Sequence, residues 1–130
     1  MEQQTKAKPV PVVLHYRGGT TERCLISPQI EADRETVTIV RDDQSLSEVP
    51  FARLKALFFL RDEELAPTEA PDDGGSMLVV EFADGEVIRG ISSGYNPARN
   101  GFYLYPVDRS KNDKIFVVNS AIVSIDVEKL

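Results

Sequence analysis

The sequence predicts an all-β protein made by tandem duplication of a five-stranded unit, each unit being a small barrel or a curved antiparallel sheet. Three observations support this prediction. Short apolar runs recur between turn residues, two segments 66 residues apart match without a gap, and an acidic stretch near the midpoint separates the matching parts. Five short strands cannot bury both faces of a flat sheet, so we expect each unit to bend or to pack against a partner sheet.

The two matching segments are 12–24 and 78–90. In each of them an apolar run ends in an aromatic residue two positions before a turn pair, which is Gly18-Gly19 in the first and Asp84-Gly85 in the second. Such pairs favour the positive φ angles of a two-residue hairpin with a primed turn. A repeat of this length with matched turn glycines indicates a duplicated unit.

The segment 51–65 is ambiguous between helix and strand, because it combines strong helix formers with apolar residues at helical spacing. Within it, residues 54–59 match residues 122–127 at a spacing of 68, where apolar and polar residues alternate. This match favours a short turn at 50–53 followed by a strand, and it leaves room for one short helical turn at 61–65.

The expected strands form two sets of five along the chain. They cover residues 12–16, 21–26, 36–41, 45–49 and 54–60 in the first set, and 78–83, 86–92, 102–107, 114–118 and 122–127 in the second. The acidic stretch between the sets is rich in Pro and Gly and is typical of a linker. The predicted organisation is a disordered N-terminal tail at 1–9, a first β unit at 10–60, an acidic linker at 61–76 and a second β unit at 77–130.

Composition excludes several classes of function. The chain has 130 residues, of which 42% are hydrophobic and 28% charged, and its net charge is −6. An acidic balance disfavours binding to nucleic acid or to an anionic membrane. No apolar run approaches the roughly 20 residues of a membrane span, and no signal peptide is visible, so the expected location is the cytoplasm.

No catalytic or metal site is predicted, and no cofactor. His15 is the only histidine, and it has no recognisable partner for general-base chemistry. Cys24 is the only cysteine and matches Gly90 in the repeat, which favours a packing position over a reactive thiol. The carboxylates around the second hairpin turn lack the spacing of a calcium loop and are expected to be solvated: Glu81, Asp84 and Glu86.

Residues 94–114 form the most informative segment, because aromatic side chains are interleaved with basic and amide side chains along it. In the expected strand at 102–107, the side chains of Tyr103 and Tyr105 lie on the opposite face from Phe102 and Leu104. Exposed tyrosines beside arginine are typical of protein-interaction surfaces. The alternative is that these tyrosines pack against the other half of the chain. The candidate interaction surface comprises Tyr95, Asn96, Arg99, Tyr103, Tyr105, Arg109 and Lys111.

Two resemblances bear on fold and function. The hairpin with its Asp84-Gly85 turn, followed by a late Ala-Ile-Val-Ser-Ile strand at 121–125, resembles the Sm-like and SH3-like small barrels. The second half also resembles an uncharacterised bacterial domain family associated with signalling and surface-motility proteins. That second likeness implies no particular activity, and it is carried by residues 80–86, 94–97, 101–106 with Asp108, and Asn112 with 115–118.

The function predicted from these observations is a non-catalytic protein-interaction or adaptor module in a bacterial regulatory or signalling pathway. The alternative is nucleotide or nucleic-acid binding, as in PilZ domains that take a cyclic dinucleotide or Sm-like barrels that take RNA. PilZ domains use spaced arginines and an Asp/Asn-x-Ser-x-x-Gly element, for which Arg17, Arg23 and 108–113 are partial counterparts. The expected partner is a protein, and exposed edge strands make a homo-oligomer plausible.

Overall fold

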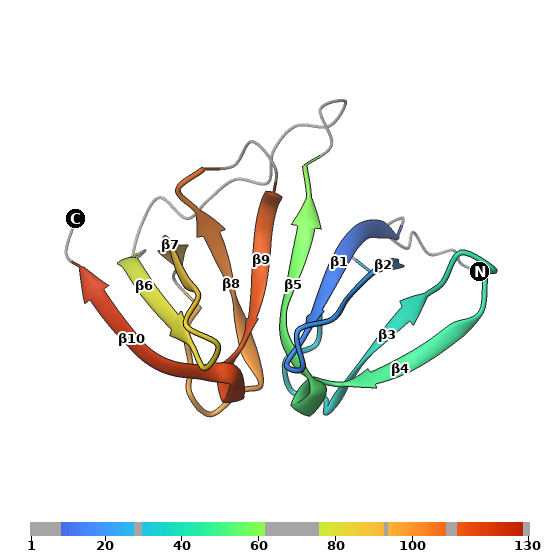
Figure 1. Ribbon diagram of the computed structural model, residues 1–130, viewed down its shortest axis with the longest axis horizontal. Helices are drawn as coiled ribbons and strands as arrows, with labels where there is room; N and C mark the ends of the chain where they lie inside the picture. Colours follow the sequence, from blue (N-terminus) through green and yellow to red (C-terminus); the bar gives the residue numbers. More distant parts are fainter. Residues whose placement is uncertain (1–8, 28–29, 62–75, 93, 109–111, 129–130) are drawn as a thin grey trace, which may run out of the picture.

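The residues that the structure describes form ten β-strands and two 3-10 helices, so the all-β prediction is confirmed (Figure 1). The computed structural model describes residues 9–27, 30–61, 76–92, 94–108 and 112–128. The first half contains β1 (Val10–Tyr16), β2 (Thr21–Ile26), β3 (Thr36–Val40), β4 (Leu46–Pro50), η1 (Phe51–Arg53) and β5 (Leu54–Leu60). The second half contains β6 (Ser76–Phe82), β7 (Val87–Ser92), β8 (Gly101–Pro106), β9 (Asn112–Val118), η2 (Asn119–Ala121) and β10 (Ile122–Glu128).

All ten strands belong to one open antiparallel sheet with the order β10-β6-β7-β8-β9-β5-β1-β2-β3-β4. The order within each half is the same, because the last strand of the half lies beside the first and the other three follow in sequence. The sheet bends into two lobes that meet where β5 and β9 run side by side at the centre of Figure 1. Strands β10 and β4 lie at opposite ends of the sheet.

The prediction of five-stranded small barrels is wrong, and the alternative of a curved antiparallel sheet describes the fold. A barrel would close each half on itself, but the outer edge of β5 pairs with β9 instead of with β4. The ladder therefore continues from one half into the other, with Ala56 opposite Val117 and Phe58 opposite Ile115.

Two hydrophobic clusters fill the two lobes, and strands β5 and β9 contribute to both. On β5, Leu57 and Phe59 pack in the cluster of the first half, whereas Ala56 packs in the cluster of the second. On β9, Phe116 belongs to the first cluster and Ile115 to the second. Side chains that alternate along a strand point to opposite faces, so these two central strands are buried on both faces.

This double burial explains the ambiguous apolar run before the midpoint. The sequence Leu-Lys-Ala-Leu-Phe-Phe-Leu has no polar alternation because neither face of β5 meets water along most of its length. The predicted short turn followed by a strand is confirmed by η1 and β5. The helical turn considered at 61–65 lies almost wholly outside the described residues, as do the N-terminal tail and all of the linker except Arg61 and Ser76, which begins β6.

The two hairpin turns form, but they are not primed two-residue turns. Only the second residue of each pair has a positive φ, +98° at Gly19 and +93° at Gly85. The amide of Gly19 donates to the carbonyl of Tyr16, which is the pattern of a type I turn followed by a left-handed glycine. The second hairpin repeats these bonds from Gly85 to Phe82. Glycine is favoured there because other residues resist this backbone conformation.

Candidate interaction groove beside strand β10

The structure places some of the predicted surface residues at an open groove. It places others at the joint between the halves, where β5 pairs with β9. The ring of Tyr95 is 42% exposed and packs edge-on against Phe102, with 5.1 Å between ring centroids. The side chain of Asn96 accepts a hydrogen bond from the amide of Ala98 at 2.9 Å, which shapes the loop after Tyr95. Tyr105 is half-buried on β8, and Arg109 and Lys111 lie outside the described residues.

Tyr103 contributes to the joint between the halves. Its hydroxyl accepts a hydrogen bond from the amide of Ile30 at 2.9 Å, and its ring packs edge-on against Phe116. Burial raises the pKa of Tyr103 above its ordinary value. Tyr103 therefore packs against the other half of the chain, which was the alternative to a place on the exposed interaction surface.

A groove of about 570 Å³ lies between the loop at 95–100 and strand β10. We call it the β10 groove. Its lining combines hydrogen-bonding side chains with aliphatic ones: Tyr95, Pro97, Arg99, Asn100, Asn119, Ser120, Ile122, Val123, Ser124, Ile125 and Val127.

The loop that forms one wall of the β10 groove is held in place by side-chain hydrogen bonds. Asn119 donates from Nδ2 to the carbonyl of Asn96 at 3.0 Å and to that of Arg99 at 2.8 Å. The guanidinium of Arg99 lies 3.4 Å from a carboxylate oxygen of Asp33, and both side chains are more than half exposed. The groove is thus a fixed surface with the guanidinium of Arg99 at its rim.

The other wall is an edge of the sheet. Within the described part of the chain, β10 pairs only with β6, so its outer backbone edge has no strand beside it. Val123 and Val127 on this strand are 59% and 62% exposed. An unpaired edge with apolar side chains is a template for another strand.

Comparison with known proteins assigns the family. The model of a family of unknown function, DUF6982, matches residues 8–129. The chain belongs to this family. No curated protein and no solved structure matches it. The expectation of an uncharacterised domain is confirmed at this level, and the DUF6982 assignment carries no activity with it.

The carboxylates predicted as solvated turn residues, Glu81, Asp84 and Glu86, are exposed in this DUF6982 chain, and Asp84 and Glu86 also bind a buried lysine. The ammonium of Lys55, on β5, lies 2.8 Å from Asp84 and also contacts Glu86, and it sits 4.9 Å above the ring of Phe82. Burial opposes the charge of Lys55, but the hydrogen bonds to the two carboxylates raise its pKa overall. This cluster ties the first half to the hairpin of the second.

His15 and Cys24 are both placed in packing positions. The imidazole of His15 lies 4.2 Å from the ring of Phe58, and burial followed by the nearby charge of Lys55 lowers its pKa. Cys24 is buried in the first cluster, and burial raises its pKa to about 11. Among the described residues, no three His, Cys, Asp or Glu side chains converge as metal ligands would, and no helix is long and apolar enough to cross a membrane.

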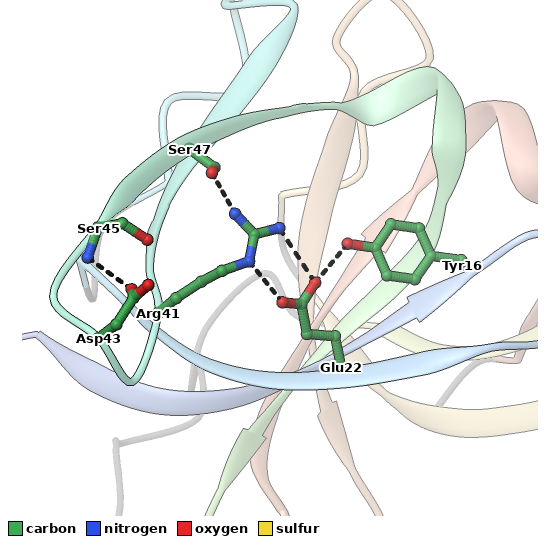
Figure 2. A network of polar contacts seen from close by, with 6 residues as sticks. All are labelled: Tyr16, Glu22, Arg41, Asp43, Ser45 and Ser47. Atoms are coloured by element: carbon green, nitrogen blue, oxygen red, sulfur yellow. Dashed lines mark hydrogen bonds and ion pairs between the residues drawn. The ribbon is translucent and has the colours of Figure 1, made fainter.

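A polar network that was not predicted from the sequence lies in the first half and reaches strand β4 (Figure 2). Glu22 accepts hydrogen bonds of 2.8 Å from Tyr16 and from Nε of Arg41. Arg41 also donates to the hydroxyl of Ser47 on β4. The bond from Arg41 lowers the pKa of Glu22, and burial raises that of Tyr16 to about 12.

This network predicts a pH-dependent contribution to stability. The pKa of Glu22 lies below its ordinary value of 4.5 in the folded protein, so ionised Glu22 stabilises the fold above that value. This contribution is lost as the pH falls through the lower folded-state pKa. The urea midpoint should therefore fall less between about pH 6 and pH 3 in Glu22→Gln than in the wild type. Parallel curves for the two proteins would show that the network does not couple to folding.

Proposed function

We propose that this DUF6982 chain is a non-catalytic protein-interaction module, and that its β10 groove receives an extended segment of a protein partner. The observation that carries the proposal is the combination of an unpaired strand edge with a fixed groove alongside it. The resemblance to domains of bacterial signalling proteins supports a role in a regulatory or signalling pathway in the cytoplasm.

The chemistry of the groove suits strand addition. When a peptide adds to a sheet edge, backbone hydrogen bonds supply affinity and side-chain pockets supply specificity. Here Ile125 and Val127 offer apolar contacts, and Arg99 and Ser120 offer hydrogen-bond donors at the rim. The guanidinium favours a segment with an acidic side chain near its end.

We also infer that the two halves descend from one duplicated unit. Their strand orders are the same. The registers of the paired strands also correspond between the two halves. For example, Leu14 opposite Leu57 corresponds to Val80 opposite Ile125. Both halves also have a register shift at the same place, at Lys55 in β5 and at Val123 in β10. Bulges are features that related folds retain.

Site-specific photo-crosslinking in the native cell tests the function. A photoreactive residue at Val127, on the groove, is expected to form covalent adducts with protein, and Arg99→Glu is expected to reduce their yield several-fold. The matched control is the same residue at Val87, which is 54% exposed on the internal strand β7. Equal adducts at both positions would contradict the proposal. Adducts at 127 that nuclease removes would favour the nucleic-acid alternative instead.

A further inference from the structure

The two end strands of the sheet, β10 and β4, correspond to the two strands that pair at the joint between the halves. Strand β5 of the first half pairs with β9 of the second. By strand order, β10 holds the place of β5 in the second half, and β4 holds the place of β9 in the first. One counterpart of β5 and one counterpart of β9 are therefore left at the two ends of the sheet, where each has an unpaired edge within the described residues.

We propose that copies of this chain associate head to tail by pairing β10 of one copy with β4 of the next, in the register of the β5–β9 joint. This inference rests on the proposed function, because it names a second copy as the partner that enters the β10 groove. Transferring the register places Ser124 opposite Val49 and Val127 opposite Leu46.

Exposed apolar side chains support this pairing. Leu46 is 69% exposed on β4 and Val127 is 62% exposed on β10, and both belong to the small set of large apolar residues left in solvent. In the transferred register they become direct cross-strand neighbours. Aliphatic cross-strand pairs of this kind stabilise antiparallel ladders.

A loop contact of the internal joint corresponds, between copies, to two residues of opposite charge. Within the chain, Asn100 donates hydrogen bonds to the carbonyls of Ala32 and Arg34. Strands β3 and β8 correspond at a spacing of 65 residues, because Thr36 opposite Pro50 then matches Gly101 opposite Val118. At this spacing Glu35 corresponds to Asn100, and Arg99 corresponds to Arg34. The joint between copies would therefore place the exposed side chain of Glu35 beside the backbone of Arg99. From there we expect the Arg99 guanidinium, at the rim of the β10 groove, to turn toward the carboxylate of Glu35.

On the opposite face of the sheet, an apolar pair of the internal joint corresponds to a polar pair at the joint between copies. Phe58 lies opposite Ile115 in the internal joint. The corresponding pair between copies is Asp126 opposite Ser47, and Ser47 already accepts a hydrogen bond from Arg41. The carboxylate of Asp126 would thus lie beside the network of Figure 2, where the guanidinium of Arg41 binds Glu22 and Ser47 and has further N–H donors that these bonds do not use.

These features predict an association that is reversible. The joint between copies replaces the large apolar side chains of the internal joint with smaller and polar ones, so it buries less apolar surface. The contact is heterologous, because different strands of the two copies meet, and such contacts build closed rings or open chains. The assembly state should therefore rise with protein concentration.

Sedimentation velocity of the full chain over a range of concentrations tests the inference. The wild type is expected to shift to larger species as concentration rises. Glu35→Arg alone and Arg99→Glu alone should each weaken association by about tenfold, because each places like charges at the joint. An equimolar mixture of the two variants should restore it, since the arginine introduced at position 35 of one variant then meets the glutamate introduced at position 99 of the other.

The matched control is Arg23→Glu, which reverses an exposed charge on the internal strand β2 and is expected to leave association unchanged. A wild type that stays monomeric at every concentration would overturn the inference, as would association that neither reversal weakens. If the chain is monomeric but position 127 still crosslinks to another protein, the proposed function stands and only the identity of the partner is refuted.

Discussion

Phe116→Ala is expected to lower the free energy of unfolding by about 3–5 kcal/mol, as large-to-small changes at fully buried aromatic positions do. The Phe116 side chain comes from β9 of the second half but is 1% exposed within the cluster of the first. Its ring packs against Phe51 and Tyr103, at centroid distances of 5.7 and 5.2 Å. A domain of this size has about 5–15 kcal/mol of stability in total, so this loss is a large fraction of it.

Urea unfolding measures the loss, and hydrogen exchange locates it. Phe102→Ala is the matched control, because Phe102 is similarly buried but belongs to the cluster of the second half. In Phe116→Ala the amides of β1 and β2 should lose protection, although both strands are distant from residue 116 along the sequence. Loss of protection confined to β7 and β8 would contradict a joint in which β9 completes the core of the first half.

The local elements of the fold could be predicted because their signals are local. The apolar run and turn glycine around Gly85 predict a hairpin, and the same pattern recurs at Gly19. The spacing between the two patterns revealed the matching halves. The predicted turn type was wrong because Gly-Gly and Asp-Gly pairs are compatible with several hairpin loops, and the sequence does not say which residue takes the positive φ.

The joint could not be predicted, because it is made by residues distant in the sequence. Nothing near β5 indicates that its outer edge pairs with β9, so closed barrels and one continuous sheet fit the same pattern of strands. The uninterrupted apolar sequence of β5 was the available signal for a strand buried on both faces. Such a run is equally compatible with a buried helix, so the signal does not identify the joint by itself.

The candidate site was predictable only in part for the same reason. Alternation places Tyr103 opposite Phe102 on its strand, but it cannot say that the other half covers Tyr103 while Tyr95 and Arg99 line a groove. The pairing of Lys55 with Asp84 has no local signal at all, because 29 residues separate the two side chains. A lysine in the middle of an apolar strand indicates only that some acidic partner must exist.

Gly101→Ala is expected to destabilise the fold by about 3 kcal/mol, at the upper end of what overpacking usually costs. Gly101 begins β8 opposite Val118. A Cβ at this position would lie 2.5 Å from an edge carbon of the Phe116 ring and closer still to the carbonyl oxygen of Val117. Neither atom can retreat, because the ring is held between the halves and the carbonyl belongs to the strand backbone.

The matched control is Gly94→Ala, where a Cβ would have no neighbouring atom within 4 Å and the backbone does not require a positive φ. Its urea midpoint should stay close to that of the wild type. Thr36 holds the place of Gly101 in the first half. It lies opposite Pro50, and its hydroxyl donates to Glu48, which holds the place of Phe116, so the unit itself tolerates a side chain there. Equal urea midpoints for the two variants would mean that a methyl group fits at position 101. The packing of Phe116 against Gly101 would then be looser than the structure shows.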